Sequence, residues 1–153
     1  MTKPRELNFR FPADAMAEAE RLAKTPTRTL GRFTHGQILE HLARTFDVAS
    51  GHAAGPAVPW FMRAMGRLIR GSLISKPMKP GFKLPGKAQS YFWPDHDVPV
   101  DQAMQHLRDA YERYQSTDPI PPHPFFGRMD RAQLDQLTCR HMALHLGFID
   151  TVA

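Results

Sequence analysis

The chain has 153 residues, a formal net charge of +5 and 42% apolar residues, so it is long enough for one domain (1–153) with its own core and too apolar to be disordered. Its single cysteine, Cys139, excludes an intramolecular disulfide and fits a reducing cytoplasm. No signal-peptide core opens the chain and no apolar run reaches the roughly 18 residues that span a bilayer, so we expect a cytoplasmic protein with no membrane partner.

The first half of the chain predicts an extended segment followed by three helices. Residues 7–11 alternate apolar and polar side chains, as a short strand does. Residues 15–24 are rich in alanine and glutamate, which favour a helix. Thr34, with a glutamine three residues later, forms a capping box for a helix that ends near Ser50. A proline suits the first position of a third helix, 59–71, whose apolar side chains should face the core.

The second half predicts one long connection and two more helices. The connection, 72–98, is rich in proline and glycine. Loops of this length are often functional, and packing of its aromatic side chains on the bundle is an equal alternative. A helix over 99–114 follows from apolar residues at helical spacing. Prolines exclude a helix over 117–124, and an aspartate and a glutamine three residues apart cap a last helix, 130–149.

Each of these helices carries an apolar stripe that must be buried against another element. We therefore predict an all-α fold, an antiparallel four-helix bundle with a short extra N-terminal segment. The strand-like segment 7–11 has no visible partner. The long connection 72–98 argues against a simple up-and-down order of the helices.

A pair of histidines, His141 and His145, is the most informative feature of the last helix. Residues four apart share a helix face, and this face also carries apolar residues, so both imidazoles should point inward. Two inward imidazoles can together bind a divalent metal. The alternative is that they hydrogen-bond to carbonyls or carboxylates, as histidines in protein cores commonly do. His41, at the edge of the apolar stripe of helix 34–50, is the best candidate for a third ligand. Three imidazoles with an open fourth position form a catalytic type of zinc site.

Other polar residues are expected near these histidines. Met142 stands where zinc proteases of the HExxH type carry their glutamate base, so that class is not indicated. Three polar residues should lie on the same helix faces as the histidines: Gln37, Arg44 and Thr138. They either orient a metal ligand, contact a substrate or are ordinary packing and hydrogen-bonding residues. His123, among prolines before the last helix, either orients a ligand or anchors its loop. No residue is assigned a catalytic role.

The middle of the chain is strongly basic. No acidic residue occurs between Asp47 and Asp95. The basic residues in this stretch are Arg63, Arg67, Arg70, Lys76, Lys79, Lys83 and Lys87. This excess could hold an anionic ligand, an acidic partner or nucleic acid, and a solvated basic surface is the alternative. The basic stretch carries no sequence motif typical of DNA- or RNA-binding domains, so nucleic acid is only weakly indicated as a partner.

Three sequence blocks follow one another along the chain: residues 36–43 (GQILEHLA), residues 123–127 (HPFFG) and residues 140–146 (RHMALHL). In this order they resemble the DinB/YfiT-like superfamily of metalloenzymes, in a branch of unknown function. The first block resembles its G-Q-x-x-x-H-L segment, the second its H-P-x-F-G element before the last helix, and the third its H-x-x-x-H-L segment.

The resemblance implies a four-helix bundle of up-down-down-up type with one long crossover, which would be the connection 72–98. It also implies a divalent metal, commonly zinc or nickel, held by His41, His141 and His145. Characterised members include thiol-dependent transferases and isomerases. The resemblance therefore implies a metal-dependent enzyme that activates a water or a low-molecular-weight thiol for transfer or hydrolysis on a small molecule. A non-enzymatic bundle that binds an acidic partner or nucleic acid through its basic middle is the alternative function.

We also expect a homodimer. Relatives often pair, and Trp60, Phe61 and Trp93 exceed the aromatic content that one small core needs.

Overall fold

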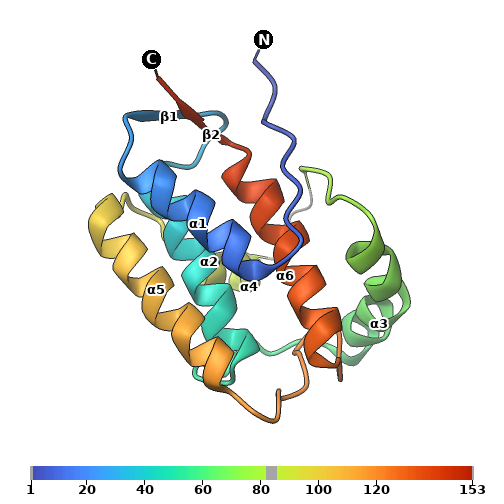
Figure 1. Ribbon diagram of the computed structural model, residues 1–153. Helices are drawn as coiled ribbons and strands as arrows, with labels where there is room; N and C mark the ends of the chain where they lie inside the picture. The colour runs from blue at the N-terminus through green and yellow to red at the C-terminus, as the bar shows by residue number, and fades with distance from the viewer. Residues whose placement is uncertain (1, 82–85, 153) are drawn as a thin grey trace.

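The computed structural model describes residues 2–81 and 86–152, so Lys83 of the basic stretch lies outside the described residues. They form helices and one small sheet (Figure 1). In chain order the elements are α1 (Pro12–Ala23), β1 (Thr27–Thr29), α2 (His35–Ala49), α3 (Trp60–Ser75), α4 (Gly86–Phe92), α5 (Val100–Ser116), α6 (Arg131–Leu146) and β2 (Ile149–Thr151).

Both predicted capping boxes are present. The Thr34 hydroxyl accepts from the Gln37 amide at 3.2 Å, and the Gln37 side chain accepts from the Thr34 amide at 2.9 Å. At α6, Asp130 accepts from the Gln133 amide at 2.7 Å, and the return bond to the Asp130 amide measures 3.1 Å. These reciprocal bonds satisfy amides that the first turn of a helix leaves without partners. They confirm the predicted starts of the two helices that carry the histidines.

Several predicted boundaries were wrong. The connection 72–98 contains helix α4, and α3 continues a turn beyond Gly71. Segment 7–11 forms no strand, whereas β1 and β2 pair antiparallel, with Thr27 opposite Thr151. The last helix ends at Leu146 because the chain then turns into β2. Strands of three residues are too short for a period-2 pattern, so only the pairing of distant segments identifies them.

The core lies among α1, α2, α5 and α6. Its fully buried side chains include Leu22, Leu39, Leu107 and Leu146, one from each of these helices. Helix α2 packs chiefly on α5, and α1 packs on α5 and α6. The short N-terminal helix α1 is therefore one of the four helices that form the core, rather than an extra segment outside it. Among the described residues, no helix has the length and apolarity needed to cross a bilayer.

The prediction that the apolar side chains of helix α3 face the core was wrong for most of the helix. The helix lies at the edge of the molecule beside α6 (Figure 1), and Gly66 is its one buried residue. Trp60 and Phe61 at its start are exposed. The smaller helix α1 already covers the part of the core that a fourth long helix would have covered.

Candidate metal centre

Three histidines from two helices meet at one point. His41 lies in the middle of α2, and His141 and His145 lie one turn apart near the end of α6. Each offers a ring nitrogen, and these three atoms all lie within 4.8 Å of one another. The Nε2 atoms of His41 and His141 are 3.1 Å apart. The structure thus brings together the three residues that the sequence singled out. His41 and His141 are 100 residues apart along the chain.

The three imidazoles are neutral near pH 7. Burial, with a further contribution from the other two imidazoles, lowers the pKa of His41 well below its usual value. Burial likewise lowers the pKa of His141 to about 4 and lowers that of His145 well below its ordinary value. A neutral imidazole keeps a lone pair on one nitrogen, which is the form that binds a metal.

A backbone hydrogen bond fixes which nitrogen of His41 is available. Its Nδ1 lies 3.1 Å from the Phe92 carbonyl oxygen, which can only accept, so Nδ1 carries the proton. The neutral ring therefore directs an unprotonated Nε2 toward His141. Two nitrogens bound to one tetrahedral zinc at 2.0–2.1 Å lie about 3.3 Å apart. The 3.1 Å separation of the His41 and His141 nitrogens fits that arrangement, and the whole set lies within 4.8 Å, so His145 would approach the other two by up to about 1.5 Å on binding.

Aromatic stacking holds the His41 ring in place. The ring of Trp93 lies parallel to it, with centroids 3.8 Å apart and an interplanar angle of 4°. Phe33 stacks on the other face of Trp93, also at 3.8 Å. Because Trp93 directly follows α4, this short helix supplies both the stacking ring and the carbonyl acceptor at Phe92.

Gln37 and Arg44 flank His41 on the same face of α2, and all three bind the end of α4. Gln37 Nε2 donates to the Pro94 carbonyl at 3.0 Å, and Arg44 Nη1 donates to the Tyr91 carbonyl at 3.2 Å. The Tyr91 carbonyl, in the last turn of α4, has no partner within the helix, and the Pro94 carbonyl lies just beyond the helix, so these side chains satisfy both. Gln37 and Arg44 therefore fix the segment that orients His41, and within the described residues they make no hydrogen bond to His141 or His145.

His123 and Thr138 occupy different surroundings. His123 Nδ1 accepts from the amides of Phe125 and Phe126 at 3.1 and 3.4 Å, and its backbone pairs with Gly127, so His123 anchors its loop. Burial, and the repulsion that a protonated His141 would exert, lower the pKa of His123 to about 4. Thr138 is half-buried one turn before His141, and within the described chain its hydroxyl makes no hydrogen bond to the three imidazoles.

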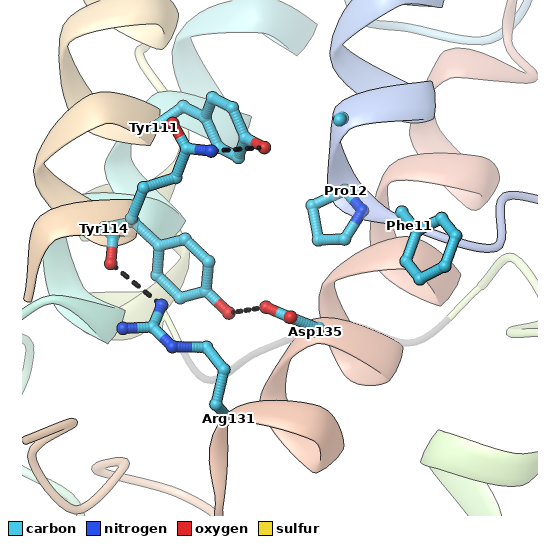
Figure 2. Close-up of a pocket in the computed structure, with 8 residues that line it drawn as sticks. Phe11, Pro12, Tyr111, Tyr114, Arg131 and Asp135 are labelled. Atoms are coloured by element: carbon cyan, nitrogen blue, oxygen red, sulfur yellow. Dashed lines mark hydrogen bonds between the residues drawn. The ribbon is translucent and has the colours of Figure 1, made fainter. Parts of the chain in front are cut away.

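A cavity of about 300 Å³ lies away from the histidines, between α1, α5 and α6 (Figure 2). Its polar groups are satisfied internally: the Tyr114 hydroxyl donates to Asp135, and Arg131 donates to the Tyr114 carbonyl at 2.9 Å. Burial and the Asp135 carboxylate raise the pKa of Tyr114. These bonds tie α5 to α6, so we assign this cavity a structural role.

With this geometry established, comparison with known families is informative. The model of the family described as "Protein of unknown function (DUF1569)" matches residues 1–151. The chain belongs to the DUF1569 family. Searches of curated proteins and of solved structures found no match. Membership of this family supplies no activity, so the three-histidine centre is the feature of the chain that points to a function.

Sequence reasoning missed Phe92 and Trp93 as parts of the centre. Both lie in the connection 72–98, where the high proline and glycine content hid helix α4. The one usable signal was the cluster of aromatic residues at 91–93, which is unusual for a solvated loop. That cluster indicates packing, but it does not identify His41 as the partner.

Proposed function

We propose that His41, His141 and His145 bind one divalent metal ion, zinc or nickel, at the centre of a metal-dependent enzyme of the DinB/YfiT-like type. The observation that carries this proposal is the approach of three neutral ring nitrogens to within 4.8 Å of one another. The same proposal includes the up-down-down-up bundle of that superfamily. An ion bound there lowers the pKa of a coordinated water or thiol and supplies a nucleophile near neutral pH.

The chain's own contribution is a set of oriented, uncharged ligands. The Phe92 carbonyl keeps the His41 proton on Nδ1, and Trp93 fixes the ring plane. Partners of this kind tune metal affinity because they hold the ligand in its binding tautomer. Three protein ligands leave one position for water, a low-molecular-weight thiol or a small substrate, which suits transfer or hydrolysis.

Glu40, next to His41, does not act as the base at this centre. One of its carboxylate oxygens accepts from Arg44 at 3.2 Å, and the other lies 2.8 Å from Nδ1 of His106. Both oxygens are thus engaged, one by Arg44 of α2 and the other by His106 of α5. The centre holds three imidazoles and, within the described residues, no carboxylate.

The test is metal binding by protein purified without an affinity tag. We expect elemental analysis to find one zinc or nickel per chain, or calorimetric titration of the chelated protein with Zn²⁺ and Ni²⁺ to give a stoichiometry of one. His41→Ala should abolish tight binding. His96→Ala removes a histidine that is exposed beside Asp95 and should bind as the wild type does. Equal binding by both variants would contradict the proposal.

The enzymatic part needs a separate measurement. Metal-loaded and chelated protein are compared for transfer of a low-molecular-weight thiol to electrophilic substrates and for hydrolysis of ester and amide substrates. Turnover that requires both the metal and His41 supports a metalloenzyme. A protein that binds metal but turns over neither class would leave a metal-binding bundle and overturn the enzymatic proposal.

A further inference from the structure

Helix α3 presents its apolar side to solvent. At about 100° per residue, five of its large apolar side chains fall on one continuous stripe along the outer face, whereas Leu73 and Ile74 near its end are half-buried against the core. The members of this outer stripe are Trp60, Phe61, Met65, Leu68 and Ile69, which are between 40% and 85% exposed. An exposed apolar patch of this kind marks an interaction surface more often than isolated apolar residues do.

The inner side of α3 fixes this orientation. A Cβ at Gly66 would lie 2.1 Å from the Phe125 carbonyl oxygen, so the helix backbone itself contacts the loop before α6. Arg70 donates to the carbonyls of Phe126 and Arg128 at 3.0 and 2.7 Å. Rotation that buried the apolar side would break these bonds and drive a side chain into the loop. The outward stripe is therefore a fixed feature of the fold.

Positive charge borders the stripe. Arg63 and Arg67 lie along one edge of it and are exposed, and Lys76 and Lys79 follow the end of the helix. No acidic residue occurs between Asp47 and Asp95 to neutralise them. An amphipathic helix with tryptophan, phenylalanine and leucine on one face and arginine beside it is typical of helices that lie in the plane of an anionic bilayer surface.

We propose that α3 docks this protein onto an anionic phospholipid bilayer, with the outer stripe at the boundary between headgroups and acyl chains and the flanking basic residues at the lipid phosphates. This role is independent of the metal centre. The sequence-based expectation of no membrane partner rested on the lack of a membrane-spanning segment. A protein that binds to the bilayer surface needs no such segment. A second copy of the chain fits less well, because pairing through α3 would gather arginines with no acidic residue in 48–94 to pair with them.

The experiment is co-sedimentation of the full chain with vesicles. We expect binding to vesicles of phosphatidylcholine and phosphatidylglycerol in equal amounts, and at least tenfold weaker binding to phosphatidylcholine alone. Binding should weaken as salt is raised, because salt screens the attraction. The tryptophan emission should shift to shorter wavelength on binding, and Trp60→Phe should remove that shift while Trp93 remains.

Matched variants assign the binding to α3. Leu68→Glu should weaken vesicle binding at least tenfold, whereas Val152→Glu, the same kind of change at an exposed apolar residue of the C-terminus, should not. Arg63→Gln with Arg67→Gln should weaken it roughly 25-fold, at about 1 kcal/mol for each charge near the surface. Lys3→Gln with Lys24→Gln removes the same charge elsewhere and should have a much smaller effect. Circular dichroism confirms that each variant is folded.

Three results would overturn the proposal. One is the absence of binding to anionic vesicles at low salt. Another is equal weakening by the α3 variants and their controls, which would indicate attraction by net charge alone. The third is a dimer in light scattering that Leu68→Glu dissociates while the wild type binds no vesicles, which would make the outer stripe an interface between copies.

Discussion

Trp93 lies flat on His41, with ring centroids 3.8 Å apart and planes inclined by only 4°. The two residues belong to different parts of the chain, α2 and the residue after α4. Since the neighbouring carbonyl of Phe92 accepts a hydrogen bond from His41 Nδ1, one short segment sets both the plane and the tautomer of this imidazole. A connection with no predicted regular structure thus orients a residue proposed to bind metal.

Loss of the Trp93 ring should weaken metal binding without removing a ligand. We expect Trp93→Ala to lower the affinity for Zn²⁺ at least about tenfold, within the range for partners that orient a ligand. Trp60→Ala is the matched control, because it removes an exposed indole from α3. Calorimetric titration measures both. Identical affinities for the two variants would show that stacking does not matter for the ligand.

His145→Ala should lose the metal and keep the fold. Two imidazoles on separate helices do not make the three-ligand set of a catalytic zinc site, so we expect an affinity loss of at least about 100-fold. The core among α1, α2, α5 and α6 should still hold the bundle, at the cost of a small cavity. His52→Ala, at an exposed position, serves as the control. Metal content and thermal melting check the two statements, and full metal content in the variant would exclude His145 as a ligand.

Gly36→Ala and Gly71→Ala should change stability in opposite directions. A Cβ at Gly36 would lie 1.6 Å from the Val98 carbonyl oxygen, and because that atom is backbone, we expect a loss of about 3 kcal/mol. A Cβ at Gly71 would meet nothing within 4 Å, so alanine should stabilise α3 by about 0.5–1 kcal/mol. Urea denaturation measures both. A neutral Gly36→Ala would mean that α2 and residue 98 separate easily.

Stability should fall between pH 6.5 and 9 because of His106. This residue bridges Glu40 at 2.8 Å and Asp47 at 2.7 Å, and those carboxylates raise its pKa from 6.5 to about 9. A raised pKa means that the folded state holds the proton more tightly. The stabilisation is therefore complete below pH 6.5 and is lost as the pH rises through about 9.

Urea denaturation of the chelated protein across this range measures the effect, and His106→Gln provides the control. The variant should show a flatter dependence on pH, because it cannot carry the proton. The slope should be modest, since the His106 side chain is about a third exposed and solvent screens its ion pairs. Parallel curves for wild type and variant would show that the bridge does not contribute.

The features of this chain that depend on near neighbours could be predicted from local sequence. The capping boxes at Thr34 and Asp130 set the starts of α2 and α6, because their hydrogen bonds join residues three positions apart. The spacing of His141 and His145 placed both on one face of a helix for the same reason. His41 was found by its place on an apolar stripe together with the resemblance to a known family.

What lies opposite each of these residues depends on tertiary packing and could not be predicted in the same way. Periodicity shows that a helix has an apolar side, but whether that side meets the core depends on which other helices already fill it. This is why α1 contributes to the core while the stripe on α3 faces outward. The stacking of Trp93 on His41 joins positions 52 residues apart, and no local pattern encodes such a contact. It follows from the packing of α4 on α2, where side chains of α2 bind the free carbonyls of Tyr91 and Phe92 at the end of α4 and that of Pro94 just after it.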